Sequence, residues 1–358
     1  MAHVQTVTGP VDPDQLGRVL SHEHLLTLLP GPGISVGIPS GRNSCGCGRA
    51  DPGPADADVD AALVDAAVTA LSGLAGQGIG TVVDLSPYGD AGRDAHGRNA
   101  ALLPEIARRT GLNIVSGTAT YREEFSPEWV RRATVDELTR RFVADATTGI
   151  GDTGVRAGIL GEQPTSQDTV TALEERGLRA AARAHHLTGL SISTHTTHGT
   201  MALEQLDILD QEHVDPGRVV IGHLDNHPEL DYLWRVLDRG TNIAFDSVGK
   251  ELWDVRVPPL PAEHPDGPYS KQAIKQSDRT RADRLAKLVA AGHADRILLS
   301  QDMAGFQVQL NPSTHGRYGY RYLGAVFTQL LLDRGVTEDQ VDLMLRANPA
   351  RLLTLDAA

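Results

Sequence analysis

Six residues of types that commonly bind metal ions follow short apolar runs in this 358-residue chain. An H-E-H triplet comes directly after RVLS, and single histidines or carboxylates follow the runs AGILG, SIST, VVIG and ILLSQ. The six are His22, His24, Glu162, His195, His223 and Asp302. Imidazole nitrogens combined with carboxylate oxygens suit Zn²⁺, and the same chemistry admits Mn²⁺, Co²⁺ or Fe²⁺. The pattern therefore predicts a metal site if the fold brings these side chains together.

The number and spacing of these residues point to two ions. Residues two apart on a strand share a face, so His22 and His24 can bind one ion together while Glu23 points away. Six ligands exceed what one tetrahedral ion needs when it also keeps a position open for water. They suit two ions about 3.5–4 Å apart, bridged by a carboxylate and a hydroxide. We therefore expect two divalent ions per chain, with zinc as the first choice.

The hydrophobic pattern predicts a fold that gathers strand ends. Short β-branched runs alternate with longer segments of helical period. The predicted strands are residues 18–21, 80–85, 113–118, 155–160, 190–194, 219–222, 242–246 and 296–300. The predicted helices are residues 58–74, 99–110, 135–147, 170–186, 201–211, 228–239, 281–291 and 320–334. This alternation predicts the α/β class and a (β/α)8 TIM barrel, whose active sites lie at the C-terminal strand ends.

The remaining segments are consistent with one barrel domain over residues 1–358. An open, doubly wound sheet is the alternative, but it usually has a glycine-rich turn after its first strand, where this chain has SHEHLL. The first residues are expected to form a short β-hairpin at the barrel floor, and residues 336–353 an extra C-terminal helix. Residues 25–57 and 250–280 are long connections after strands, and such loops are commonly lids or binding loops.

The chain resembles the phosphotriesterase family of the amidohydrolase superfamily over nearly its whole length. The resemblance is carried by LGRVLSHEHLL, VVDLSPYGDAGRD, GTATY, AGILGEQPTS, STHTTHG, VVIGHLDNHPELDYL, AFDSVGKE, ADRILLSQDM and NPARLL, in that order. It implies a distorted TIM barrel, two divalent ions, a small-molecule substrate and a homodimer. It also implies that His22, His24 and Asp302 bind the more buried ion, and His195 and His223 the more exposed one.

Two positions depart from the best-known members of that family. Where those members carry a bridging carbamylated lysine, this chain has Glu162, which places it in a Glu-bridged branch and makes Glu162 the expected bridge. Both groups supply one negative charge and two oxygens, so the metal pair survives the exchange. After the seventh strand, the lactonase branch tends to carry Asp-Arg, whereas this chain has Asp246–Ser247, which weakens a homoserine-lactone interpretation.

Three further residues are candidates for substrate contacts. Tyr121 matches the aromatic residue that lines the pocket of lactonase-like members, and a packing role beneath a loop is the equal alternative. Arg93 could reach an anionic substrate group, although a structural ion pair with a loop carboxylate is favoured. His227 follows His223 by four residues and could line the mouth of the barrel.

The expected chemistry is hydrolysis without a protein nucleophile. Two ions generate hydroxide at neutral pH, and no G-x-S-x-G elbow is present. Asp302 would be both ligand and proton acceptor. A lactone, carboxylic ester or amide is the expected substrate class, with promiscuous phosphotriester cleavage. A metal-dependent lyase or isomerase and a catalytically silent binding homologue remain the alternatives.

Charge and composition limit the classes of partner and the cellular compartments that are expected for this protein. There are 33 Lys and Arg against 46 Asp and Glu, a net charge of −13, which disfavours nucleic acid as a partner. We expect no apolar stretch long enough to span a membrane and no signal peptide at the N-terminus. Cys45 and Cys47 are the two cysteines and are interpreted as plain loop thiols. A cytoplasmic enzyme is the resulting prediction.

Overall fold

The computed structural model describes residues 1–27, 57–257, 273–305 and 307–356. Most of the predicted 25–57 loop, with Cys45 and Cys47, and the middle of the 250–280 loop lie outside these residues. The described ends of the second loop pair as an antiparallel ribbon of β10 (Val255–Val257) and β11 (Ala273–Lys275), which the sequence did not predict.

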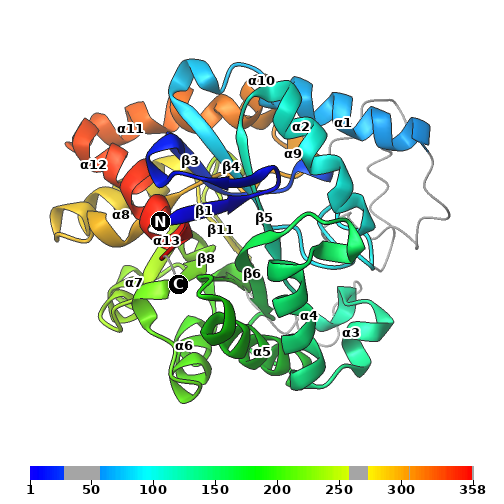
Figure 1. Cartoon of the computed structure of the whole chain (residues 1–358). Helices are drawn as coiled ribbons and strands as arrows, with labels where there is room; N and C mark the ends of the chain where they lie inside the picture. The colour runs from blue at the N-terminus through cyan, green and yellow to red at the C-terminus, as the bar shows by residue number, and fades with distance from the viewer. Residues whose placement is uncertain (28–56, 258–272, 306, 357–358) are drawn as a thin grey trace, which may run out of the picture.

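Eight parallel strands form a nearly closed barrel, as predicted (Figure 1). In chain order they are β3 (Arg18–Glu23), β4 (Ile79–Asp84), β5 (Asn113–Thr118), β6 (Ala157–Thr165), β7 (Ile192–Thr196), β8 (Val219–Gly222), β9 (Asn242–Phe245) and β12 (Ile297–Leu299). Each strand pairs with the next through β9 and β12. At the closing edge, the Ser21 hydroxyl donates to the Leu299 carbonyl (3.3 Å), and the Asp302 amide donates to the His22 carbonyl (3.0 Å).

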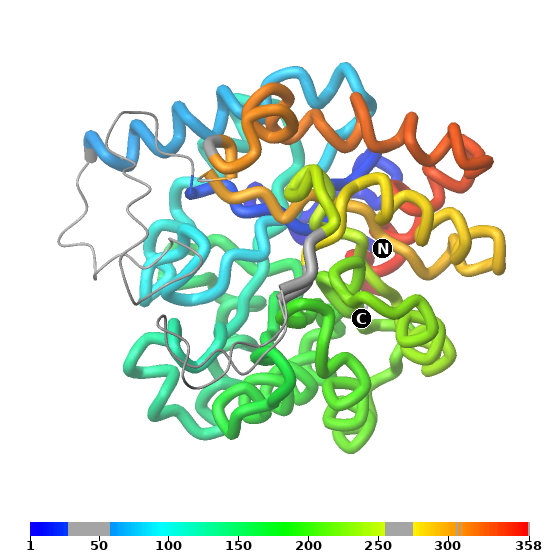
Figure 2. Tube along the Cα trace, turned by 180° about the vertical axis from the view of Figure 1, so that it is seen from behind, coloured from blue at the N-terminus to red at the C-terminus, as the bar shows by residue number. Residues whose placement is uncertain are grey.

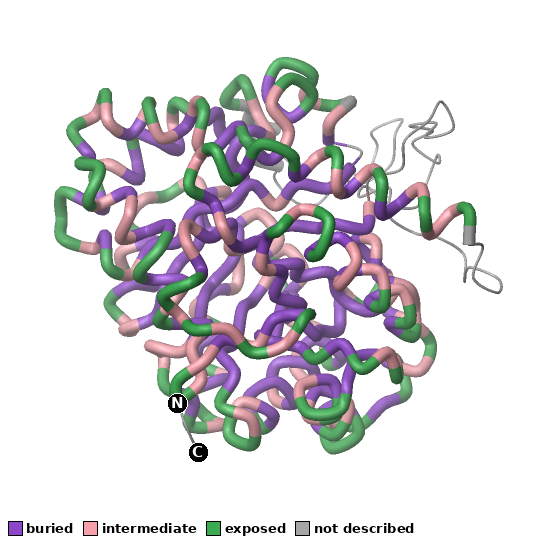
Figure 3. Tube along the Cα trace, turned by 45° about the horizontal axis from the view of Figure 1, so that its top comes forward, coloured by how far each residue is buried: buried purple, intermediate pink, exposed green. Residues whose placement is uncertain are grey.

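Helices surround the barrel on its outside (Figures 1 and 2). They are α1 (Ala57–Leu71), α2 (Leu103–Thr110), α3 (Glu128–Arg132), α4 (Val135–Thr147), α5 (Ala172–Thr188), α6 (Ala202–Gln211), α7 (Leu230–Leu237), α8 (Asp278–Ala290), α9 (Gln307–Leu310), α10 (His315–Tyr318), α11 (Thr328–Leu332), α12 (Glu338–Asp342) and α13 (Asn348–Leu353). The predicted helices 320–334 and 336–353 are each interrupted by a π-helical turn, at Leu323–Phe327 and Leu343–Ala347. The backbone of the strands is buried, and exposed residues gather on the outer helix faces and turns (Figure 3).

Local sequence sets where several helices begin. The Thr134 hydroxyl accepts from the Glu137 amide while the Glu137 carboxylate accepts from the Thr134 amide, which starts α4. Thr171 and Glu174 make the same reciprocal pair at α5. Such capping boxes satisfy two amides that have no partner inside the helix. These helix starts are therefore readable from the sequence.

The N-terminal hairpin closes the barrel floor, as predicted. β1 (His3–Thr6) pairs antiparallel with β2 (Gly9–Val11) on one side and with β13 (Thr354–Leu355) on the other, which brings the two chain ends together (Figure 1). Val4 and Leu353 pack against barrel residues such as Val115. At Gly158 of β6, an added Cβ would lie 2.3 Å from the Gln5 carbonyl oxygen, so only a glycine at this position leaves room for the hairpin.

One segment departs from the expectation about membrane spans. Residues 58–77 are long and apolar enough to cross a membrane by length and composition, with a mean hydropathy of 1.4. In the structure, this segment comprises α1 and the turn after it, and Leu63, Val64, Ala67 and Leu71 are buried on the protein side. The helix α1 packs on α2, and 28% of the apolar window is buried in the structure.

Candidate metal centre

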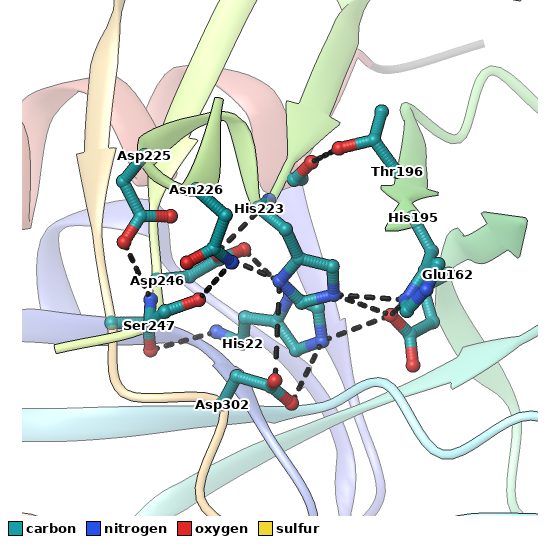
Figure 4. A network of polar contacts seen from close by, with 12 residues as sticks. His22, Glu162, His195, Thr196, His223, Asp225, Asn226, Asp246, Ser247 and Asp302 are labelled. Carbon is teal, nitrogen blue, oxygen red and sulfur yellow. Dashed lines mark hydrogen bonds and ion pairs between the residues drawn. The ribbon is translucent and has the colours of Figure 1, made fainter. Parts of the chain in front are cut away.

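The barrel gathers all six predicted ligands at the C-terminal ends of its strands. Figure 4 labels five of them, namely His22, Glu162, His195, His223 and Asp302. His22 lies in β3, and His24 follows that strand directly; Glu162 lies in β6 and His195 in β7. His223 follows β8, and Asp302 lies three residues after β12. β6 continues to Thr165, five residues beyond the predicted end, so Glu162 is an inner residue of a strand rather than a residue of the following loop.

The described residues form three groups of potential metal ligands, one of which is His22, His223 and Asp246. The other two consist of the six predicted residues, and the first of these is His22, His24 and Asp302. Nε2 of His24 lies 2.8 Å from Oδ1 of Asp302, and Nε2 of His22 lies 3.6 Å from the same oxygen. Both histidines are buried. This group combines two imidazole nitrogens with one carboxylate oxygen, a donor set that suits a divalent transition metal.

Glu162, His195 and His223 form the second group. Nδ1 of His195 lies 2.9 Å from Oε2 of Glu162 and 2.9 Å from Nε2 of His223. Nε2 of His223 in turn lies 3.3 Å from Oε2 of Glu162. Three potential donor atoms from three strands therefore point at one small volume.

The Glu162 carboxylate lies between the two groups. Its Oε2 contacts the second group and is also 3.3 Å from Nε2 of His22, while its Oε1 is 3.7 Å from Nε2 of His24. The side chain is 1% exposed. Burial alone would raise the pKa of Glu162, but the His22 and His195 imidazoles hold it well below its usual value. An ionised carboxylate with one oxygen toward each group is suited to bridge two cations.

The residues present fit a pair of divalent metal ions. Nε2 of His22 is buried and has no hydrogen-bond partner among the described residues, although carboxylate oxygens of both Glu162 and Asp302 lie within 3.6 Å of it. Buried polar atoms normally have partners, and an unsatisfied one calls for an explanation such as an ion. The convergence of this nitrogen with donors of both groups is compatible with a bound ion.

Glu23 contributes to the site although it points away from the ligand groups, as expected. Its Oε1 accepts from the Ser300 hydroxyl (2.7 Å) and the Gln301 amide (3.0 Å), and its Oε2 accepts from the Met303 amide (2.8 Å). Full burial raises the pKa of Glu23 to about 7. The residue between the two histidines thus holds the chain segment that carries Asp302.

The structure places Arg93 behind His24. Nη2 of Arg93 lies 3.2 Å from Oδ2 of Asp84 and donates to the Ser116 hydroxyl (2.9 Å). Asp84 accepts from the Ser86 hydroxyl (2.6 Å), whose oxygen lies 3.2 Å from Nδ1 of His24. The carboxylate partner predicted for Arg93 was a loop residue, and this was wrong because Asp84 is the last residue of β4. Buried Arg93 therefore supports His24 through Asp84 and Ser86.

Of the other predicted substrate contacts, Tyr121 lies beside the ligands and His227 does not. The buried Tyr121 ring meets the His195 ring edge-on, with centroids 5.2 Å apart. The half-buried His227 ring stacks on Tyr232 at 4.0 Å, and its Nδ1 accepts from the Glu229 amide. Tyr121 can therefore border a substrate that binds at the second group. His227 instead stacks on Tyr232 of α7, which indicates a structural role.

Two residues at the site were not predicted from the sequence. Asp246 contacts His22 and His223, and Nζ of Lys250 forms an ion pair with Oδ2 of Asp302. Burial alone would lower the pKa of the Lys250 ammonium, but Asp302 raises it above its usual value. Asp246 stands directly after β9, at the same end of the barrel as Glu162 and Asp302, so its position at a strand end was the available signal. For Lys250, which lies at the start of a long loop, the sequence offered no signal.

Comparison with known protein families is consistent with this geometry. A family model described as the phosphotriesterase family matches residues 2–353. The chain belongs to this family. The expected family and the barrel fold are thereby confirmed.

Individual phosphotriesterase-family relatives cover the barrel and are hydrolases where an activity is named. The phosphotriesterase homology protein of Escherichia coli is 36% identical over 255 residues, which are 71% of this chain and 79% of the relative. The N-acetyltaurine hydrolase of Danio rerio is 27% identical, covering 98% of this chain and 97% of the relative. A double mutant of the organophosphorus hydrolase from Deinococcus radiodurans superposes with a TM-score of 0.75 at 30% identity, covering 98% of this chain and 96% of that chain. The chain is accordingly an enzyme of a hydrolase family.

Proposed function

We propose that this phosphotriesterase-family enzyme is a binuclear divalent-metal hydrolase. The supporting observation is the position of Glu162, whose two carboxylate oxygens face two separate groups of ligands. His22, His24 and Asp302 would hold one ion, and His195 and His223 the other, with Glu162 shared between them. Zinc is the first candidate, and manganese, cobalt or iron would fit the same donors.

The metal ions and the protein side chains would have different roles in the reaction. When bound, the ions would supply a hydroxide at neutral pH and a Lewis acid for the oxygen of the scissile group. Asp302 would accept the proton that the attacking water releases, because one of its oxygens faces His24 and the other remains directed toward the mouth at Lys250. Lys250 would keep that carboxylate ionised and oriented.

A carboxyl-derived substrate is the preferred class: a lactone, a carboxylic ester or an amide, with promiscuous phosphotriester cleavage. One relative is named for an N-acetyl amide and another for organophosphorus compounds, so the family acts at both carbonyl and phosphoryl centres. Tyr121, next to His195, would form one wall of the substrate site. The homodimer and the cytoplasmic location stay predictions.

Elemental analysis of fully loaded protein tests the binuclear proposal. We expect about two divalent ions per chain, because six ligands exceed one ion's need. One ion or none in fully loaded protein would overturn the proposal. Screening the loaded protein against ester, lactone and amide libraries in ¹⁸O-labelled water then tests the reaction type, since hydrolysis places the label in a product, whereas a lyase or isomerase leaves the product unlabelled.

A further inference from the structure

Asp246 contacts histidines of both ligand groups at once. Its Oδ2 lies 2.9 Å from Nδ1 of His22, and its Oδ1 lies 2.9 Å from Nδ1 of His223 (Figure 4). Oδ1 also accepts from the backbone amide of His223 (3.0 Å). The side chain is fully buried and comes directly after β9, at the C-terminal end of that strand. No other described carboxylate outside the six ligands is in contact with two of them.

These contacts fix which nitrogen of each ring is available to an ion. A carboxylate next to Nδ1 keeps the proton of the neutral imidazole on that nitrogen, which leaves Nε2 as the donor atom. Nε2 of His22 is the atom that faces Asp302 and Glu162, and Nε2 of His223 faces Glu162 and His195.

The Asp246 carboxylate is itself held in place by the backbone around it. His223 has a positive φ of 57°, which is uncommon outside glycine, and its amide donates to Asp246 at this turn. The next residue, Ser247, donates its amide to Asp225 (3.3 Å) and accepts from the Asn226 side chain (2.7 Å). Asp246 therefore cannot move away from one histidine without also changing its contact with the other.

We propose that Asp246 is a positioning residue that couples the two metal positions. This inference rests on the proposed two-ion function. An ion at one position fixes a histidine and hence the carboxylate, and the carboxylate then holds the histidine of the other position in its binding rotamer. The second ion consequently finds its ligand already ordered, which is positive cooperativity through reduced motion.

Ser86 provides a matched control because it supports a ligand of one group only. Its hydroxyl lies 3.2 Å from Nδ1 of His24 and is otherwise bonded to Asp84 and Ala91. Ser86→Ala removes the hydroxyl behind one histidine, whereas Asp246→Asn changes the support behind two. An asparagine keeps the shape of the side chain, but its amide has one acceptor oxygen and so can hold only one Nδ1–H.

The experiment is a calorimetric titration of metal-free protein with Co²⁺. For Asp246→Asn, we expect the affinity of both ions to fall by about 10- to 100-fold and their cooperativity to be lost. For Ser86→Ala, we expect one ion to weaken and the other to keep its affinity. If Asp246→Asn weakens a single ion, or neither, the coupling is refuted. If the wild-type protein binds fewer than two ions, the proposed function itself fails, so the two failures are distinguishable.

A measurement on the wild-type chain covers the case in which Asp246→Asn does not fold. In the proton NMR spectrum of the Co²⁺-loaded protein, the ring N–H protons of His22 and His223 should appear as paramagnetically shifted signals that exchange slowly with water, because both are buried on Asp246. Assignment by ¹⁵N-histidine labelling with His22→Gln and His223→Gln variants identifies them. Absence of either Nδ1–H signal would overturn the proposal.

Discussion

Replacing Arg281 with methionine should destabilise the protein strongly, since this buried guanidinium ties three carboxylates together. Arg281 is fully buried in α8, and its nitrogens lie 2.6 Å from Asp225, 2.5 Å from Glu251 and 3.2 Å from Asp278. Removing one partner of a buried ion pair costs about 3–5 kcal/mol, because the remaining charge is left without compensation. With an unfolding entropy of about 0.75 kcal/mol/K for 358 residues, that corresponds to a fall in Tm of about 4–7 °C.

The loss of stability caused by Arg281→Met should increase with pH, because removing Arg281 changes the pKa of Asp225. Burial raises the pKa of Asp225 to about 6 even with Arg281 in place. Without Arg281 the pKa rises further, so the folded variant binds a proton above pH 6 that the folded wild type has released. Since the unfolded chains titrate alike, the variant loses stability relative to wild type as the pH rises from 6 to 8.

Arg132→Met is the matched control for this measurement. Arg132 makes a 2.6 Å contact with Glu128, the same distance as Arg281 with Asp225, but its side chain is 79% exposed. Exposed pairs contribute about 0–1 kcal/mol, so the Tm should fall by less than about 2 °C. Calorimetric melts of the metal-free proteins at pH 6 and pH 8 test both variants. Equal shifts for the two variants would refute the argument that burial determines the cost.

Three predictions concern the metal centre. Asp302→Asn should retain most of its metal but lose on the order of 10²-fold or more in kcat. Bound metal and kcat are measured on the same preparation. A loss of rate that tracks the loss of metal would mean that Asp302 is only a ligand. Glu162→Gln should lose at least one ion, because the charge offsetting two dications is gone, and metal analysis that finds both ions with full turnover would contradict the bridge. Removal of metal by a chelator should lower the Tm, because a metal concentration of 1,000 times Kd stabilises the folded protein by about 4 kcal/mol. An unchanged Tm would show that no ion binds the folded state preferentially.

The six candidate ligands could be recognised in the sequence because each lies in or just after a recognisable strand. Alternation along β3 places His22 and His24 on one face, and parallel strands bring their C-terminal ends to one end of a barrel. Capping residues such as Thr134 and Thr171 also mark helix starts locally. These signals lie within a few residues of one another, so a single sequence contains them.

Other parts of the fold depended on contacts between distant segments. The extension of β6 through Glu162 to Thr165 is set by its pairing with β5 and β7 rather than by its own composition. The π-helical turn at Leu343–Ala347 likewise interrupts a segment whose pattern predicts one continuous helix. Local propensity cannot specify such features when tertiary pairing and packing decide between alternatives of similar local energy.

The supporting contacts of the metal centre were decided by the tertiary structure alone. Asp246 meets His22 across 224 residues, and Lys250 meets Asp302 across 52. Neither pair has a spacing or a motif that would associate its members, because the order of the strands around the barrel brings β9, β12 and β3 together although they lie far apart in the sequence. The sequence by itself determined which residues can bind ions, through residue type and position at strand ends. The tertiary structure determined which groups support each histidine, since that depends on side chains from different strands meeting at the C-terminal end of the barrel.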